Sequence, residues 1–405
     1  MENRPQFTAS DEWPALAREC PHLDVCAGCP IMNVPYSTQL TSKKNVLKNL
    51  LMYFVKEFEI IPSPQLEFHR NRADFWYDPA QQLGFRNKNN RFTGTFIPSC
   101  QLISPRAQHA YVFLEKYLKE KNIPAYSVLE HNGFLRYVSF RESKTNGQLI
   151  IVINTYTNTS HDEKIIEALA HEIMSQKLAD GVVWVHNPTL NDTVQGDIFR
   201  QWGNCILTEK MSDIPLQYDV NCFFQTNPRS AENAQKFVVE LIHARNAKAT
   251  ILDLYCGVGL FALPLSMKGH FVKGIELSKD SIIWARKNAH NLGLDDSVAF
   301  EIGDVSAKLK EMEKTNEKFE TILLDPPRSG LSKKIWRRIL RQNPHQIVYV
   351  SCNPVALKRD LEWLSEYAEY RIENARAFDF FPHSEHVEMV VDIRVEKIKE
   401  FKMGG

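Results

Sequence analysis

The sequence lacks an excess of charge of either sign. Its 405 residues include 49 Lys and Arg against 49 Asp and Glu, so the formal net charge is zero. Nucleic-acid-binding domains usually carry a basic excess, and the overall charge therefore gives no support to an RNA or DNA partner. No apolar run reaches the roughly 18 residues of a membrane-spanning helix, and the first six residues lack the apolar stretch of a secretion signal. We expect a cytoplasmic protein with no membrane partner.

Glycine and proline are also modest in number, at 17 and 20, and no internal repeat or low-complexity tract occurs. With 43% hydrophobic residues, the composition is that of an ordinary globular protein, and the length indicates two or three domains. Two stretches, 79–114 and 326–345, contain basic residues but no acidic ones. Each is either a positive surface or a solvated face balanced by acids elsewhere in the fold.

Eight cysteines in a cytoplasmic chain argue against a disulfide scaffold, because thiols stay reduced there. Cys20, Cys26 and Cys29 follow the spacing C-x5-C-x2-C, and Cys100 comes after a turn-rich strand region. Four thiolates suit zinc, and they suit an iron–sulfur cluster equally well. The spacing predicts a metal or cluster site and leaves its identity open.

Hydrophobic periodicity divides the chain into three regions, 1–105, 106–219 and 220–405. The first holds the cysteines, an expected helix over 36–58 and strands near 69–77, 82–86 and 91–97. The central region mixes strands near 134–141, 149–155 and 182–186 with a helix that a capping box at Ser160 and Glu163 would open. It contains no catalytic signature, so we expect an α+β domain that binds RNA or acts as a spacer.

The third region alternates strands and helices. Five strands are expected, at 250–255, 271–276, 298–302, 321–325 and 346–351. This pattern predicts an α/β fold with a parallel sheet covered by helices on both faces. Two extended runs at 371–381 and 386–395 would close the sheet as an antiparallel pair. A doubly wound sheet with this reversed ending resembles the class I S-adenosylmethionine methyltransferases.

A glycine-rich loop follows the first of these strands. Gly257 and Gly259 would let a ligand approach the backbone, and Glu276 ends the next strand, where a carboxylate can accept from ribose hydroxyls. The loop fits a nucleoside-bearing cofactor. A dinucleotide dehydrogenase shares this feature, and a purely structural turn is the plain alternative.

Two later motifs favour a methyltransferase. Asp325-Pro-Pro-Arg328 follows the fourth strand and Ser351-Cys-Asn-Pro354 follows the fifth, so both lie at the edge of the sheet that carries the glycine loop. A dehydrogenase has no evident use for Cys352 there, although a buried structural thiol would need none. Near the C-terminus, Glu388 follows a histidine-containing turn and is a candidate base.

These motifs together resemble the RNA uracil-C5 (5-methyluridine) methyltransferases, the enzymes of ribosomal RNA and of the tRNA T-loop. The resemblance runs in order along nearly the whole chain, from the cysteine motif through Phe223-Phe-Gln-Thr-Asn227 and the glycine loop to Phe381-Pro-His-Ser-Glu-His-Val-Glu388. It implies Cys352 as nucleophile and Glu388 as base, with His383 and Glu385 as the next candidates for the base. It further implies the cofactor or active-site positions Gln225, Tyr255, Leu260, Glu276, Asp304 and Asp325. At Leu260 some members carry asparagine.

The same resemblance favours a [4Fe–4S] cluster on Cys20, Cys26, Cys29 and Cys100. It also favours 23S ribosomal RNA as substrate, with the tRNA T-loop as the alternative, and leaves protein partners unknown. Only 19 residues precede Cys20, so RNA binding should depend on the remaining domains. We expect one face of the helix after Asp325, with Lys334, Arg337, Arg338 and Arg341, to contact RNA phosphates.

The chemistry agrees with the resemblance. Uracil C5 is a poor nucleophile, but a thiolate that adds at C6 makes an enolate whose C5 can attack a methyl sulfonium. A base must then remove the C5 proton. Two rivals remain: a methyltransferase acting on an exocyclic amine or another nucleobase atom, which would need no thiol, and an RNA-binding protein that has lost activity.

Overall fold

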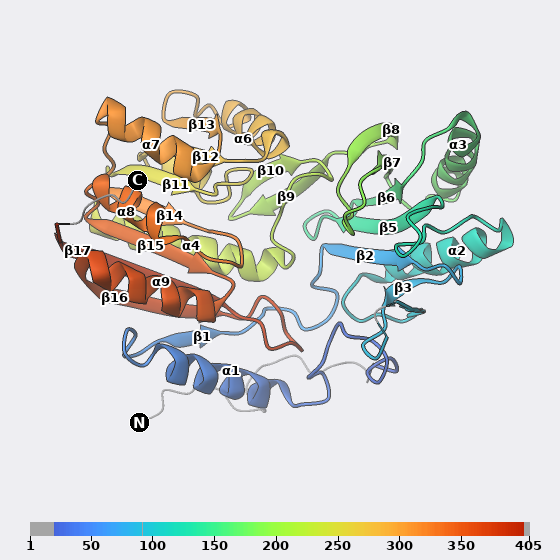
Figure 1. Cartoon of the computed structure of the whole chain (residues 1–405), viewed down its shortest axis with the longest axis horizontal. Coiled ribbons are helices and arrows are strands. Elements are labelled where there is room, and N and C mark those ends of the chain that lie inside the picture. The colour runs from blue at the N-terminus through green and yellow to red at the C-terminus, as the bar shows by residue number, and fades with distance from the viewer. Residues whose placement is uncertain (1–19, 91, 401–405) are drawn as a thin grey trace.

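Two mixed β-sheets organise the chain, each within its own lobe (Figure 1). The computed structural model describes residues 20–90 and 92–400. The first 19 residues, on which the expectation of no secretion signal rests, and Arg91, which begins the expected strand 91–97, lie outside the described residues. Within those ranges no helix is both long and apolar enough to cross a membrane.

The first lobe contains an eight-stranded sheet in the order β1-β16-β17-β15-β14-β11-β12-β13. The five adjacent strands from β15 to the edge strand β13 are parallel, and β17 runs antiparallel to both of its neighbours. Their bounds are β11 Thr250–Leu254, β12 Phe271–Glu276, β13 Val298–Ile302, β14 Thr321–Leu324, β15 Gln346–Ser351, β16 Ala368–Phe378 and β17 Glu388–Ile398. This doubly wound sheet with a reversed terminal pair confirms the predicted α/β class I methyltransferase fold.

Apolar side chains alternate between the two faces of this sheet, as buried strands require. Ile251 belongs to one core and its neighbour Leu252 to the other. Helices α4 (Pro228–Arg245), α5 (Ala262–Met267) and α6 (Lys279–Asn291) contribute to the first core. The second core includes side chains of α7 (Val305–Thr315), α8 (Lys333–Arg341) and α9 (Pro354–Tyr367).

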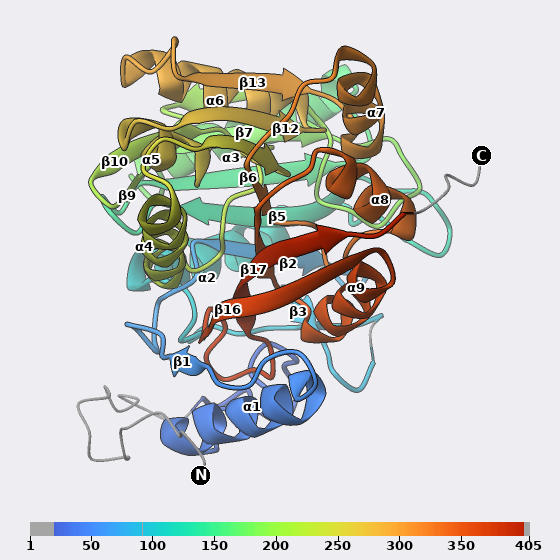
Figure 2. The same ribbon diagram turned by 90° about the vertical axis from the view of Figure 1, so that its left-hand side faces the viewer.

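The N-terminal segment also packs against this sheet. Helix α1 (Tyr36–Leu51) buries Leu40 and Leu47 in the second core, and β1 (Glu59–Ile61) pairs in parallel with β16 at the sheet edge (Figure 2). The helix stops at Leu51, short of the expected residue 58, and after a turn the chain continues as β1, in which the β-branched Ile60 and Ile61 pair with β16. Tertiary pairing here overrides the local helical periodicity.

The second lobe contains a seven-stranded sheet in the order β4-β3-β2-β5-β6-β7-β8. Its elements are β2 Arg72–Tyr77, β3 Leu83–Arg86, β4 Gly94–Thr95, α2 Pro105–Glu120, β5 Leu135–Glu142, β6 Leu149–Thr155, α3 Ser160–Ser175, β7 Gly181–His186 and β8 Asp197–Gly203. Helix α3 begins one residue earlier than expected: Thr159 and Asp162 form the capping box, in place of Ser160 and Glu163. The hairpin β9 (Leu207–Met211) and β10 (Ile214–Tyr218) connects the two lobes.

Candidate active site

The expected site residues of the third region gather where the parallel strands end. Tyr255, Glu276 and Asp325 each end a strand or directly follow one, and Cys352 directly follows β15. Because β11, β12, β14 and β15 are parallel, these residues share one edge of the sheet. Asp304 also lies at this edge, two residues after β13.

Strand register brings Cys352 and Glu388 together. Ser351 pairs with Met389 across the antiparallel strands β15 and β17. Cys352 comes directly after Ser351, and Glu388 comes directly before Met389, so the two lie opposite each other at the sheet edge. Cys352 is half-buried, and Glu388 is buried at 3% exposure.

The positive charge of Arg328 acts on both Cys352 and Glu388. Burial, followed by the negative charge of Glu388, raises the pKa of Cys352 to about 12, while Arg328 lowers it. Burial and Asp325 raise the pKa of Glu388 well above its usual range, again opposed by Arg328. Arg328 also lies 3.1 Å from Nδ1 of His386 through its Nη2. Arg328 was not among the residues expected at the site, although it belongs to the Asp325-Pro-Pro-Arg328 motif.

Asp325 joins a distant motif to this edge. Gln225 donates from Nε2 to Asp325 Oδ2 at 3.3 Å. Burial and then Glu276 raise the pKa of Asp325 to about 7, against the lowering effect of Gln225. Beneath them lies Asp253, fully buried, whose pKa burial and the charge of Asp325 raise well above the usual range. Asp253 was not among the residues expected at the site.

The glycine loop has the backbone shape that a close ligand requires. Gly257 has φ of +55°, and a Cβ there would meet nothing within 4 Å, so the backbone faces open space. Its N–H donates to Glu276 Oε2 at 3.3 Å, which ties the loop to the end of β12. Tyr255 also has positive φ, +68°, a strained value for a tyrosine. The loop is built to bring backbone close to a bound molecule.

Two of the expected cofactor positions differ from the rest. Leu260 is buried at 8% exposure in the first core, and its carbonyl oxygen accepts from Gln235 Nε2 at 2.6 Å. Asp304 is exposed and caps α7, accepting from the Ala307 N–H at 2.9 Å. The side chain of Leu260 thus offers no polar group to a ligand, whereas Asp304 has a second carboxylate oxygen.

The alternative bases, His383 and Glu385, occupy different surroundings. His383 is fully buried and is held by Gln39 and by the carbonyl oxygen of Leu66. Glu385 is exposed. Of the three candidate bases, Glu388 alone has a strand register that places it opposite Cys352.

The four predicted ligand cysteines line one small cavity in the other lobe. Cys20, Cys26, Cys29 and Cys100 share it with apolar side chains, including Leu23, Met32, Phe85, Ile97 and Leu102. Among residues 20–90 and 92–400, no three His, Cys, Asp or Glu side chains stand in an arrangement that could hold a metal ion. Four thiol side chains that line one cavity are nevertheless the donor set that a thiolate-bound group takes.

Several basic side chains of the two stretches 79–114 and 326–345 form ion pairs with carboxylates from other parts of the chain. Arg86 and Arg106 form ion pairs with Asp192 at 2.6 Å and Asp180 at 2.7 Å. The expected RNA-facing set on α8 is wrong in part: Arg338 is buried at 5% exposure and bonds Ser306, and Arg341 pairs with Glu313 at 3.0 Å. The spacing did place these side chains on a helix, but part of that face packs against α7.

Known proteins resemble this chain along most of its length. The tRNA (uracil-5-)-methyltransferase family matches residues 35–395. The chain belongs to this family. It is an RNA uracil-C5 methyltransferase on a class I fold, which confirms the predicted enzyme class and excludes the rival that acts on an exocyclic amine.

Individual relatives cover almost all of the chain. A tRNA (uracil(54)-C(5))-methyltransferase of Pyrococcus furiosus is 32% identical over 403 residues, 97% of this chain and 90% of that protein. A 23S rRNA (uracil(747)-C(5))-methyltransferase of Pyrococcus horikoshii is 29% identical over 93% of this chain and 84% of that protein. The crystal structure of Pyrococcus abyssi tRNA (uracil-54, C5)-methyltransferase in complex with S-adenosyl-L-homocysteine has a TM-score of 0.75 and 31% identity, covering 95% of this chain and 89% of that chain.

Proposed function

We propose that this enzyme methylates uracil C5 with S-adenosylmethionine through a covalent bond between Cys352 and uracil C6, with Glu388 as the base. The observation that carries the proposal is the strand register that sets Cys352 opposite Glu388 at the sheet edge bearing the glycine loop. A thiol and a carboxyl group there are what addition at C6 and proton removal at C5 require.

S-adenosylmethionine is supported as methyl donor by the S-adenosyl-L-homocysteine complex of the Pyrococcus abyssi relative. When bound, it supplies the electrophilic methyl group. In this chain the open backbone at Gly257 and the carboxylate of Glu276 suit its nucleoside part, while Gln225, Tyr255, Asp304 and Asp325 surround the same edge. For Leu260 we propose a packing role in place of a polar contact, since its side chain is in the core.

The bonds change in a fixed order on the uracil ring. The Cys352 thiolate forms the S–C6 bond, and the electron pair of the C5–C6 double bond moves into an enolate. C5 then attacks the methyl carbon as that carbon's bond to the sulfonium sulfur breaks. Glu388 takes the C5 proton, the C5–C6 double bond re-forms, and the Cys352 sulfur leaves as thiolate.

Cys352 must lose its proton before this sequence can start. Its pKa of about 12 means that the thiol form dominates at neutral pH, and the positive charge of Arg328 is the nearby influence that favours the thiolate. The target uridine has to leave its stack to reach a half-buried sulfur, so we expect a flipped or loop nucleotide. An RNA substrate locates this activity inside the cell, in keeping with the cytoplasmic expectation.

For the substrate we propose the T-loop uridine of tRNA. The support is that relatives at 31–33% identity over most of the chain bear the name tRNA (uracil(54)-C(5))-methyltransferase, whereas the 23S rRNA relative stands at 29%. The 23S ribosomal RNA that the sequence alone favoured therefore becomes the second candidate. A methylation assay decides between the two candidate substrates. It compares an unmodified tRNA transcript, the same transcript with the T-loop uridine changed to cytidine, and fragments of 23S rRNA. Methylation of rRNA fragments alone would contradict the tRNA proposal.

We further propose that Cys20, Cys26, Cys29 and Cys100 hold a [4Fe–4S] cluster. Four cysteine thiolates are the ligand set of such a cluster, and these four converge on one cavity with apolar walls. Burial raises the pKa of Cys29 to about 12 and that of Cys100 to about 11, so a bound cation is needed for them to become thiolates near neutral pH.

A further inference from the structure

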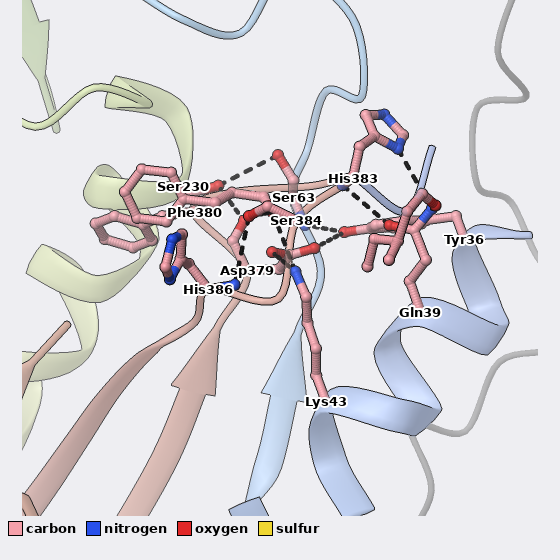
Figure 3. Close-up of polar contacts among 12 residues, drawn as sticks. Tyr36, Gln39, Lys43, Ser63, Ser230, Asp379, Phe380, His383, Ser384 and His386 are labelled. Carbon is pink, nitrogen blue, oxygen red and sulfur yellow. Dashed lines mark hydrogen bonds and ion pairs between the residues drawn. The ribbon is translucent and has the colours of Figure 1, made fainter. Parts of the chain in front are cut away.

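A buried ion pair joins α1 to the turn that leads into the catalytic strand β17 (Figure 3). Lys43 donates from Nζ to Asp379 Oδ1 at 2.7 Å and to the carbonyl oxygen of Phe381 at 3.1 Å. The side chains of Lys43 and Asp379 are 3% and 0% exposed. Asp379 follows the last residue of β16, and the turn ends at Glu388, the first residue of β17.

The same turn is held from two other directions. Tyr36 donates from its hydroxyl to Asp379 Oδ2 at 2.8 Å and accepts from the Ser63 N–H at 2.8 Å. Ser230 in the first turn of α4 donates to the Asp379 carbonyl oxygen at 3.1 Å, and Asn227, which caps α4, donates to that of Phe380 at 3.0 Å.

Gln39, one helical turn before Lys43, secures the middle of the turn. Its Oε1 accepts from the His383 N–H at 2.9 Å, and its Nε2 donates to the carbonyl oxygens of Ile31 and Val34. The Ile31 N–H in turn donates to the His383 carbonyl oxygen at 3.2 Å. The segment just after Cys29 is therefore bonded to the turn that precedes Glu388.

Stability alone is a weak reason for such an arrangement. A buried ion pair loses about as much to desolvation as it gains from attraction, and an apolar pair of similar volume is often as stable. What the ion pair does provide is a fixed location for the turn, because Lys43 reaches a side chain and a main-chain carbonyl at once. The last part of that turn also carries His386, which contacts Arg328 beside Cys352 and Glu388.

We propose that Lys43 is a positioning residue for removal of the C5 proton. By fixing Asp379 and Phe381, it keeps the turn, and with it the carboxyl group of Glu388, within reach of C5 of the bound uracil. The inference rests on the proposed role of Glu388 as base. It concerns one step only: addition of Cys352 and methyl transfer precede proton removal, and Glu388 takes no proton in them.

The test uses the double variant Lys43→Met/Asp379→Asn, which removes both charges and so leaves no unpaired ion buried. The amide oxygen introduced by Asp379→Asn can still accept from Tyr36, and the Phe381 carbonyl oxygen retains its bond from Ser384. Lys48→Met, at an exposed lysine of the same helix, is the matched control. Tyr36→Phe is a milder second variant, which decides the matter if the double variant fails to fold.

Two RNA substrates separate the steps. On uridine RNA, the double variant should extend the lifetime of the methylated enzyme–RNA adduct by about 10- to 100-fold, as a displacement of roughly 1 Å can. On 5-fluorouridine RNA, where no C5 proton can be removed, it should form the adduct at the wild-type rate. Tyr36→Phe should act in the same direction and less strongly, and Lys48→Met should behave as wild type on both.

An adduct lifetime equal to wild type in the folded double variant, or in Tyr36→Phe if the double variant does not fold, would overturn the inference. The inference would also be overturned if the double variant formed the adduct on 5-fluorouridine RNA more slowly than wild type, by the same factor as it slows release of the adduct on uridine RNA. A general structural defect would then be the cause. Glu388→Gln, assayed in parallel, distinguishes the two proposals. If Glu388→Gln turns over normally, the proposed base is wrong; if it accumulates adduct and the Lys43 variant does not, only the positioning role fails.

Discussion

Gln225 donates a hydrogen bond to Asp325 across 100 residues of sequence, and this contact joins the segment before α4 to the end of strand β14. The carboxyl group of Asp325 lies with those of Asp253, Glu276 and Glu388 at one sheet edge. Besides burial, Glu276 raises the pKa values of Asp253 and Asp325, and Asp325 in turn raises those of Asp253 and Glu388. Such a cluster of acids attracts positive charge, and the sulfonium of S-adenosylmethionine carries one.

The raised pKa of Asp325 predicts how stability depends on pH. In the folded protein this pKa is about 7, against about 4 in the unfolded chain. Between these values the folded state alone holds the proton, so the free energy of unfolding falls as the pH rises through this window. Asp325→Asn cannot titrate. The melting temperature of the variant minus that of wild type should therefore become larger as the pH rises from about 5 to about 7.5.

Thermal melting of the ligand-free protein at several pH values measures this effect. Asp213→Asn is the control, because that side chain is 96% exposed. A constant difference in melting temperature between Asp325→Asn and wild type would show that Asp325 is ionised in the folded protein.

Substitution of the nucleophile and of the base should stop the reaction at different points. Cys352→Ala should bind S-adenosylmethionine and RNA but give neither product nor adduct. Glu388→Gln can still add and methylate but loses the C5 proton slowly, so a methylated adduct should accumulate as a slow band on a denaturing gel. Wild type should give a comparable band with 5-fluorouridine RNA.

Mass spectrometry of the adduct provides the counter-test. If Cys352→Ala still forms product, or if the adduct maps to the buried Cys256, Cys352 is not the nucleophile. Wild-type turnover by Glu388→Gln would show that the base lies elsewhere.

The charge of Arg328 should set the pH at which the enzyme becomes active. Arg328 lowers the pKa values of Cys352 and Glu388, so Arg328→Met should raise both. Because the thiolate is the nucleophile, the rate of single-turnover adduct formation should rise with pH and reach its midpoint at higher pH in the variant. Arg328→Lys, which keeps the charge, should show a smaller displacement. A lower rate with an unchanged midpoint would mean that Arg328 acts by contact rather than through its charge.

The cysteine cavity predicts a bound cluster that can be measured independently of catalysis. Protein purified without oxygen should be brown and contain about four irons with acid-labile sulfide per chain. Cys26→Ser should lose both, whereas Cys222→Ser, outside the cavity, should retain them. Zinc without sulfide would favour the other metal that four thiolates suit.

The parts of this molecule that the sequence could predict are those governed by local periodicity. The strands Phe271–Glu276, Val298–Ile302 and Gln346–Ser351 lie where alternation and flanking turns indicated. Since parallel strands bring their carboxyl ends to one edge, the common location of Glu276 and Cys352 followed from those strands alone.

Long-range pairing was beyond the reach of the same reasoning. Nothing in residues 36–61 indicates that their partners are in β16 and the turn after it, so the end of α1, the strand β1 and the Lys43–Asp379 ion pair went unforeseen. On α8 the sequence predicted a surface that is partly buried. The basic stretch expected to contact RNA contains Arg338, which is buried and bonds Ser306. Spacing along a helix identifies which side chains share a face, but not what covers that face.

The pairing of β1 with β16 also bears on how the enzyme is made. Glu59 pairs with Arg376, so a strand that leaves the ribosome early must wait for one that leaves it near the end of translation. Until then β1 and the apolar side of α1 have no partner, and contacts between such distant residues form slowly. The first lobe, which holds the eight-stranded sheet, can therefore reach its final form only once the chain is almost complete. A fragment that begins after the second lobe would lack β1, the strand that covers this edge of the sheet.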